Sequence, residues 1–321
     1  SPATVSRCFN HPALVREDTR FRINAAVEET GYIRNRAASA IHGKTSGTIG
    51  LLVPTIDNSI FSRLIQSFSE TLDRLGYSML ISTNGYDPEL EYTQLRNMLE
   101  HRVDAIALVG LDHSQRIYSL LKSRRTPAIA LWNFDETSPV SCVGADNREA
   151  GRAAAAHILE QGHRSIALVF PPEAHNDRAQ GRLRGVRDRL AAQGVEVPKA
   201  YCLTAKYDTA HAYKEALALF RSGNRPGAVI AGNDVIARGV VVAAHEAGLR
   251  VPEDLSVIGI GDFPGSAEFV PPLTTVNLSA TEVGRTAAEL LARELIDQDA
   301  ETIERVRSPV QLIVRKSTAA C

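Results

Sequence analysis

From residue 48 onward, short apolar runs alternate with amphipathic segments, and this alternation strongly restricts how the chain can fold. The runs are almost continuously apolar, as in residues 105–109 (AIALV), which is typical of strands buried on both faces. The segments between them have helical periodicity, and several end at a glycine that can cap a helix. The pattern predicts an α/β fold with parallel sheets covered by helices. The expected strands are Thr48–Val53, Tyr77–Ser82, Asp104–Val109, Ala128–Trp132, Ser165–Phe170, Gly227–Ala231 and Ser256–Ile260.

The series of strands starts again after residues 162–165 (GHRS). A restart of this kind predicts two similar lobes, because one sheet containing all the strands would be unusually wide. A length of 321 residues provides enough chain for two cores. Ligands of open parallel sheets bind beyond the carboxyl ends of the strands. The cleft between the two lobes is therefore the expected ligand site.

The charge is unevenly distributed along a nearly neutral chain. The whole sequence has 36 basic and 37 acidic side chains, but residues 1–44 carry a net charge of +3 and the remainder −4. A basic head suits phosphate contacts at one end of the chain only. A helix is expected at Arg22–Thr30, ending at Gly31. Its apolar face is narrow, and a unit this small needs a further helix, expected before Ser1, to complete its core.

Several classes of protein are excluded by what the sequence does not contain. The four cysteines have no paired spacing, which argues against a disulfide framework or a metal site and favours a reducing cytoplasm. No apolar run is long enough for a membrane span. Residues 259–265 (GIGDFPG) have the glycines of a dinucleotide-binding loop, but Phe263-Pro264 stands where its helix must begin. We therefore expect no enzymatic activity, no cofactor and no metal.

A series of short motifs runs through the chain in a recognisable order. They are residues 4–10 (TVSRCFN), 31–38 (GYIRNRAA), 49–54 (IGLLVP), 162–167 (GHRSIA), 232–234 (GND), 251–257 (VPEDLSV) and 272–276 (PLTTV). Together they resemble the lactose-repressor family of bacterial transcription regulators. The resemblance implies a DNA-binding head, a hinge helix and a two-lobed core like that of periplasmic sugar-binding proteins, assembled as a dimer or a dimer of dimers.

The resemblance also implies the boundaries of four parts. They are a partial helix-turn-helix head at 1–34, a hinge helix and linker at 35–47, a first effector lobe at 48–162 plus 278–308, and a second at 163–277 plus 309–321. The first helix of the family's head is missing from this sequence. We therefore expect weak operator binding by a chain that begins at Ser1.

The DNA-contacting positions follow from the same resemblance. Ser6 and Arg7 are expected to discriminate bases, because Pro2 and Ala3 cannot form bidentate hydrogen bonds. Ile41 is expected to act as an apolar wedge in the minor groove. The full set is Thr4, Ser6, Arg7, Asn10, Tyr32, Asn35, Ala38 and Ile41. The alternative is a capped surface helix followed by an ordinary linker.

The expected effector contacts follow from the resemblance and from positions just after strands. They are Phe61, His113, Trp132, Asp146, Arg178, Arg182, Asn233 and Asp262. For Phe61 the alternative is a core position, and for His113 an exposed loop position. Asp234 is expected to be the N-cap of a helix at Val235–Ala247.

One departure from the family pattern indicates the chemistry of the effector. Gly261 stands where many sugar-responsive relatives have an aspartate, while Arg178 and Arg182 are retained. Losing a carboxylate and keeping arginines favours an anionic ligand. We therefore expect a sugar acid such as gluconate or ketogluconate, since residues 85–88 (GYDP) and the His113 loop resemble the gluconate-regulator branch. The alternative is a solute-binding protein with the same two lobes and no DNA role, which would have a signal peptide in place of the basic head.

Overall fold

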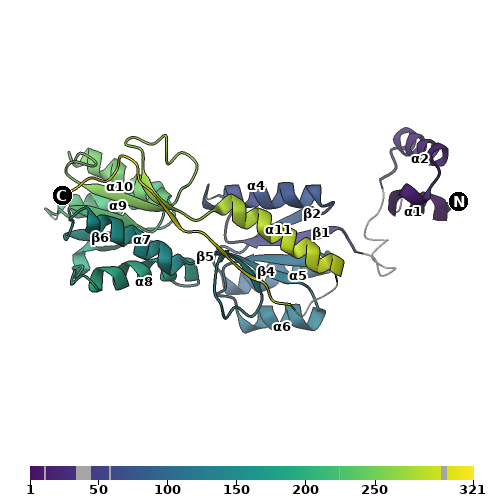
Figure 1. Cartoon of the computed structure of the whole chain (residues 1–321), viewed down its shortest axis with the longest axis horizontal. Coiled ribbons are helices and arrows are strands. Elements are labelled where there is room, and N and C mark those ends of the chain that lie inside the picture. The colour runs from purple at the N-terminus through teal and green to yellow at the C-terminus, as the bar shows by residue number, and fades with distance from the viewer. Residues whose placement is uncertain (11, 34–44, 58, 224, 298–301) are drawn as a thin grey trace. The chain divides into compact units, whose positions relative to one another are not determined.

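The computed structural model describes residues 1–10, 12–33, 45–57, 59–223, 225–297 and 302–321, which form two compact units, Ser1–Ser46 and Gly47–Cys321 (Figure 1). The hinge contacts predicted at Asn35, Ala38 and Ile41 lie outside the described residues. No helix among those described has the length and apolar character needed to cross a bilayer.

The smaller unit contains α1 (Pro2–Asn10), a short 3₁₀ turn at Pro12–Leu14 and α2 (Glu17–Thr30). Helix α2 begins five residues earlier than expected. Two acidic residues occupy its first turn, where they interact favourably with the unpaired N–H groups of the helix end. The helix ends at Gly31, whose φ of +60° allows the Tyr32 N–H to bond to the Val27 carbonyl at 3.1 Å.

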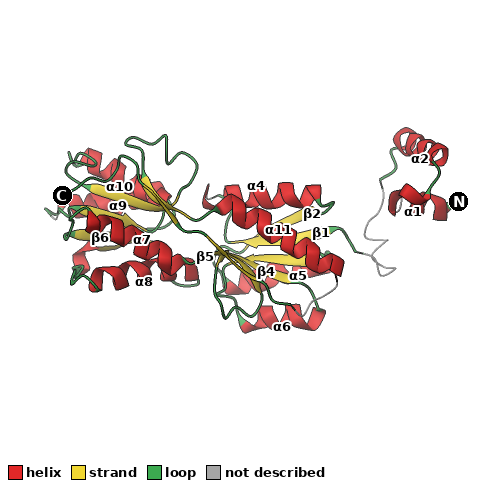
Figure 2. Cartoon of the chain, viewed as in Figure 1, coloured by secondary structure: helices red, strands yellow, loops and turns green. Residues whose placement is uncertain are grey.

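The first lobe of the larger unit is built on a six-stranded sheet, counted over the described residues. In spatial order its strands are β11 (Arg305–Ser308), β5 (Ser141–Ala145), β4 (Ala128–Asn133), β3 (Ala105–Val109), β1 (Thr48–Val53) and β2 (Ser78–Thr83). All neighbouring pairs are parallel. Helices α4 (Ser59–Arg74) and α11 (Ala280–Asp297) pack together over one face, and α5 (Pro88–Glu100) and α6 (Gln115–Arg124) cover the other (Figure 2).

The second lobe repeats this arrangement on another six-stranded sheet. Its strands are β12 (Gln311–Ile313), β10 (Thr274–Asn277), β9 (Ser256–Gly261), β8 (Ala228–Ala231), β6 (Ile166–Phe170) and β7 (Cys202–Thr204), of which only the β10–β12 pair is antiparallel. Helices α7 (Asn147–Glu160) and α8 (Asp177–Ala191) cover one face, and α9 (Thr209–Arg221) and α10 (Asp234–Glu246) the other. The predicted α/β fold of two parallel-dominated sheets is confirmed.

The chain passes between the lobes after β5, after β10 and after β11, so the described residues include three crossings. One expected boundary was wrong. Helix α7 packs on α8 and on strands of the second sheet, so the chain enters the second lobe before α7 and not after residue 162. The close approach of α7 and α8 explains this placement, because a Cβ atom at Gly151 would lie 2.0 Å from the Arg182 carbonyl oxygen.

Candidate ligand-binding site

The side chain of Arg182, on α8, is completely buried between the carboxyl ends of strands. Its Nε donates to Asn147 Oδ1 at 2.8 Å, and its Nη1 donates to the Gly232 carbonyl at 2.9 Å. Its Nη2 has no hydrogen-bond partner among the described residues. Burial lowers the pKa of Arg182, against the opposing influence of Tyr207 and Asp234. The structure thus holds a buried guanidinium that forms no ion pair with any described carboxylate.

Asn147 connects Arg182 to Trp132 at the end of β4. The Asn147 amide donates to the Trp132 carbonyl at 3.3 Å and to Asn133 Oδ1 at 3.1 Å. Trp132 is buried, its φ is +75°, and its indole N–H has no partner in the part of the chain that the structure describes. Positive φ is rare for a bulky residue and is concentrated at functional sites. Phe61 packs edge-on against the indole, with ring centroids 5.9 Å apart.

The backbone at Trp132 is accommodated by a glycine on the neighbouring strand. Gly144 lies opposite Trp132 in the parallel register of β4 and β5. A Cβ atom at Gly144 would lie 2.4 Å from the Trp132 carbonyl carbon and from the Asn133 nitrogen. Only glycine allows this close approach, so the position of the indole depends on both strands.

Asn233 directly precedes α10 and follows Gly232, whose carbonyl accepts from Arg182. Its Oδ1 accepts from the Ile236 N–H at 2.9 Å, which makes Asn233 the N-cap. The expectation that Asp234 is the cap was therefore wrong. The Asp234 carboxylate is buried and instead accepts from the Phe263 N–H at 2.8 Å and from two hydroxyl groups. Burial raises the pKa of Asp234, although these hydrogen bonds oppose the shift.

Arg182, Asn147, Trp132 and Asn233 form what we call the Arg182 network. The network contains three buried donor nitrogens without a partner among the described residues, namely Arg182 Nη2, Trp132 Nε1 and Asn233 Nδ2. Buried polar groups are nearly always hydrogen-bonded, and leaving one unpaired costs about 1–3 kcal/mol. All three unpaired groups are donors. They favour a ligand that presents oxygen acceptors.

Arg178, one turn earlier on α8, has a different environment. Its Nη1 donates to Asp177 Oδ1 at 2.8 Å and to the Val109 carbonyl at 3.1 Å. Burial lowers the pKa of Arg178, but Asp177 and then Tyr86 raise it, so the net shift is upward. Arg178 is therefore compensated by a carboxylate, whereas Arg182 is not.

His113 is buried and does not lie in an exposed loop position. Its two ring nitrogens lie 3.0 Å from Glu91 Oε1 and 3.0 Å from the Gly110 carbonyl. Both nitrogens thus have partners within the first lobe. This side chain has no ring nitrogen left for a ligand in the present arrangement.

A cavity of about 410 Å³ lies between the lobes beyond strands of both sheets. It is lined by Thr55, Asp57, Gly85, Tyr86, Pro171, Pro172, Ala174, Asn176, Lys206 and Tyr207. Tyr86 of the first lobe and Tyr207 of the second stack there, with ring centroids 6.2 Å apart. None of the eight predicted effector residues lines this cavity. Sequence reasoning did not identify the tyrosine pair.

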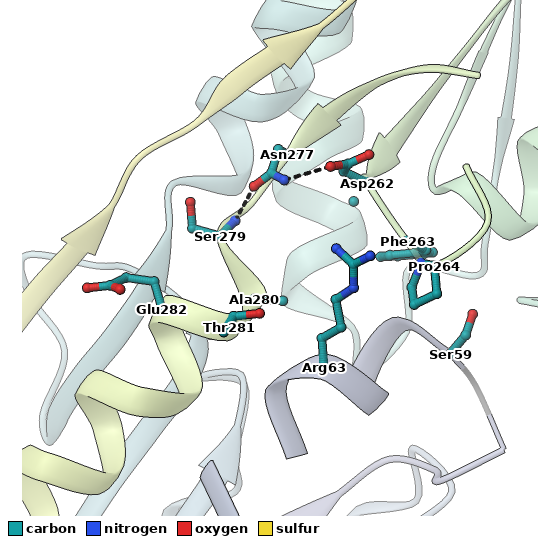
Figure 3. Close-up of a pocket in the computed structure, with 11 residues that line it drawn as sticks. Ser59, Arg63, Asp262, Phe263, Pro264, Asn277, Ser279, Ala280, Thr281 and Glu282 are labelled. Carbon is teal, nitrogen blue, oxygen red and sulfur yellow. Dashed lines mark hydrogen bonds between the residues drawn. The ribbon is translucent and has the colours of Figure 1, made fainter. Parts of the chain in front are cut away.

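Asp262 belongs to a different cavity, of about 270 Å³, where β9 and β10 approach the beginnings of α4 and α11 (Figure 3). Its carboxylate accepts from Arg315 at 2.7 Å and from the Asn277 amide at 2.8 Å. Figure 3 shows Arg63 extending from α4 towards Phe263 in this cavity. Asp262 therefore lies outside the Arg182 network.

Asp146 also lies outside the network. Its Oδ1 caps α7 by accepting from the Arg148 and Glu149 N–H groups at 2.9 and 3.0 Å, and its Oδ2 accepts from Arg307 at 3.1 Å. The neighbouring Asn147 contacts Arg182 instead. Only the geometry of a helix start distinguishes Asp146, which caps the helix, from Asn147, which faces inward. Among the described residues, no cluster of His, Cys, Asp or Glu could hold a metal ion.

Family models and solved structures agree with this architecture. A model described as bacterial regulatory proteins, lacI family, matches residues 1–35, and a periplasmic binding protein-like domain matches residues 155–318. The chain belongs to the LacI family. It is a transcription regulator with a ligand-binding domain and not an enzyme. The match at the head decides against the alternative of a solute-binding protein without a DNA role.

Similar regulators align over 84–100% of this chain. The repressor PurR of Haemophilus influenzae is 28% identical over 99% of this chain and 95% of its own length. The lac repressor dimer bound to operator and the anti-inducer ONPF is 27% identical, covers 100% of this chain and 96% of that one, and has a TM-score of 0.86. The regulator GntR of Chromobacterium violaceum is 27% identical over 84% of this chain and 99% of that one, with a TM-score of 0.79.

The described part of the head that matches the LacI model contains five of the predicted DNA contacts. Thr4 is partly buried, and its hydroxyl oxygen lies 3.1 Å from the hydroxyl oxygen of Ser1. Ser6 and Arg7 are exposed on α1. Tyr32 is 53% exposed and packs near Phe9. Asn10 ends α1. An apolar groove of about 710 Å³ separates α1 and α2, and no α2 residue is buried among those described.

Proposed function

We propose that this LacI-family regulator is a repressor that binds operator DNA as a dimer and is switched by a sugar acid, of gluconate or ketogluconate type, bound at the Arg182 network. The observation that carries the proposal is the buried Arg182 guanidinium, which has no ion-paired carboxylate among the described residues and has one unpaired N–H group. The effector's carboxylate would supply the missing negative charge.

Two arginines on α8 differ in whether a carboxylate compensates their charge. Arg178 has Asp177 as its counter-ion, whereas Arg182 donates only to an amide oxygen and a backbone carbonyl. Burying an ion without a partner costs roughly several kcal/mol, even after the surrounding protein has relaxed. A carboxylate at Arg182 would offset this cost, and bidentate pairing with a guanidinium is favourable in geometry as well as charge.

The other two unpaired groups favour a polyhydroxylated ligand. The Trp132 and Asn233 N–H groups require acceptors, and sugar hydroxyls can provide them. The edge-on pair of Phe61 and Trp132 is buried in the ligand-free arrangement and would provide apolar contacts for the carbon face of a sugar bound beside it. A neutral sugar could satisfy these two groups but would leave the Arg182 charge uncompensated.

The relatives support the regulator and leave the effector open. The lac repressor is known as a dimer on operator DNA, and a regulator CelR, 26% identical over 99% of this chain with a TM-score of 0.73, is known in complex with cellobiose, a neutral sugar. We infer operator binding, a dimer and a cytoplasmic location, where the chromosome is accessible. We propose DNA contacts from Thr4, Ser6, Arg7, Asn10 and Tyr32, with base discrimination by Ser6 and Arg7, and hinge contacts from Asn35, Ala38 and Ile41.

Calorimetry with gluconate, ketogluconate, galactose and cellobiose tests the effector class. We expect micromolar binding of at least one sugar acid and none of the neutral sugars. Micromolar binding of a neutral sugar without binding of either acid would overturn the sugar-acid assignment and leave the regulator class intact. An operator shift assay with and without the bound acid then shows whether it induces or co-represses.

A further inference from the structure

Two side chains at the start of α8 join the second lobe to the first. Asp177 and Arg178 belong to α8, while their partners Val109, Leu111 and Asn133 belong to the end of β3, the loop after it, and the end of β4. Asp177 Oδ2 accepts from the Leu111 N–H at 2.7 Å and from the Asn133 amide at 2.8 Å. Arg178 Nη1 donates to the Val109 carbonyl at 3.1 Å.

These bonds are buried and charge-assisted. The side chains of Arg178 and Asp177 are 6% and 16% exposed. Burial alone would raise the pKa of Asp177, but Arg178, Asn133 and Leu111 more than compensate and lower it. The carboxylate is thus ionised near neutral pH, and hydrogen bonds to an ionised group are about twice as strong as neutral ones.

The first lobe is shaped to receive this pair. Gly110 has a φ of +97°, and a Cβ atom there would lie 2.0 Å from Arg178 Nη1 and 2.8 Å from Asp177 Oδ1. The absence of a side chain at Gly110 lets both charged groups approach the backbone after β3. The Tyr86–Tyr207 stack provides a second contact between the same two lobes.

From these contacts we propose that Asp177 and Arg178 form a latch that holds the two lobes together when no effector is bound. The latch biases the lobe arrangement towards closure through contacts that include no ligand. A ligand can shift such an equilibrium only by its differential affinity for the two arrangements. The latch therefore sets the starting population on which any effector acts, and it does not depend on which effector binds.

Two neighbouring amides report on the latch. The Leu111 N–H is bonded across the lobes to Asp177, whereas the Gly110 N–H is bonded to the Leu131 carbonyl within the first lobe. In the full-length, ligand-free protein we would measure hydrogen exchange of both amides, together with the radius of gyration by small-angle X-ray scattering.

The test variant is Asp177→Asn, which keeps the side-chain shape and removes the charge. We expect exchange at Leu111 to accelerate by about tenfold, because the Asn oxygen can still accept from the Leu111 N–H but lacks the charge that roughly doubles the strength of the bond. Exchange at Gly110 should stay unchanged, and the radius of gyration should increase. The matched control is Asp188→Asn on the same helix, because Asp188 pairs with Arg148 and Arg152 of α7 within the second lobe.

A second variant removes the latch from the opposite side. Gly110→Ala pushes Arg178 away without changing any charge and should reproduce the larger radius, which keeps the proposal testable if Asp177→Asn does not fold. Unchanged exchange at Leu111 in Asp177→Asn would overturn the latch. Faster exchange with an unchanged radius would also overturn it, because only the loop and not the lobe contact would then have loosened.

Discussion

Arg178 and Arg182 are both buried, lie one turn apart on α8 and differ in one respect, the presence of a carboxylate partner. We predict that replacing Arg178 by methionine mainly lowers stability, whereas replacing Arg182 by methionine mainly weakens ligand binding. Methionine preserves most of the apolar volume of the arginine side chain and introduces no charge. The pair of variants therefore isolates the role of the counter-ion.

The expected magnitudes follow from what each substitution leaves behind. Arg178→Met leaves the Asp177 carboxylate buried without its cation, and breaking a buried pair in this way costs about 3–5 kcal/mol. Arg182→Met loses two charge-assisted hydrogen bonds of about 1.5–3 kcal/mol each. It also removes the desolvation cost of an uncompensated guanidinium, several kcal/mol in rough terms. These contributions nearly cancel, so we expect a net loss below about 2 kcal/mol.

Urea unfolding at pH 7 gives the stabilities, and calorimetry with the sugar acid gives the affinities. Arg182→Met should weaken binding by about a hundredfold, equivalent to two lost charge-assisted bonds at tenfold per 1.4 kcal/mol. In the folded fraction of the Arg178→Met protein, binding should be weakened less than in Arg182→Met. Equal destabilisation by the two substitutions would refute the reasoning that Arg182 has no effective counter-ion in the ligand-free protein.

Three further predictions concern the surroundings of the site. Asp234→Ala leaves three buried donors unpaired and should cost about 3–5 kcal/mol in the free energy of unfolding measured with urea; a loss below about 1 kcal/mol would contradict the hydrogen-bond assignment. The pKa of Asp177 is lowered from its ordinary 3.8, so its contribution to stability is present above that value and is lost as the pH falls through the lower folded value. The difference in free energy of unfolding between wild type and Asp177→Asn should accordingly shrink in acid. A difference that grows in acid would contradict a lowered pKa of Asp177. Gly144→Ala forces backbone atoms at Trp132 to move and should cost about 1–3 kcal/mol, with a shift in the fluorescence of the single tryptophan that an undisturbed indole would not show.

The α/β fold was predictable because it depends on periodicity. The run Thr48–Val53 is a strand over the expected residues, and Asp104–Val109 differs from the observed strand by one residue. Buried parallel strands that are apolar on both faces can be recognised in the sequence one by one. The short edge strands β7, β11 and β12 were not expected, because a half-exposed segment of three or four residues has no distinctive pattern. The interior strands β5 and β10 were also missed, because their sequences SCVGA and TTVN mix polar and apolar residues although both are largely buried.

The candidate site was predictable as a set of segments but not as a set of contacts. Arg182, Trp132 and Asn233 fall in one network, as placement after strand ends suggests. The sequence could not show that Asn147 and not Asp146 reaches Arg182, since both residues stand at the same helix start. Nor could it show that Asp177 neutralises Arg178, because that pairing depends on the rotamers of adjacent residues.

The sequence by itself determined the family, the α/β fold with two sheets, and the presence of two arginines one helical turn apart in the segment after Phe170. Tertiary structure decided which charges are compensated. A residue's type states what it can donate or accept, but its net electrostatic effect depends on burial and on partners brought from other elements. Arg178 and Arg182 have the same chemistry in the sequence, yet only the fold leaves one of them paired with a carboxylate and the other with an unpaired N–H group.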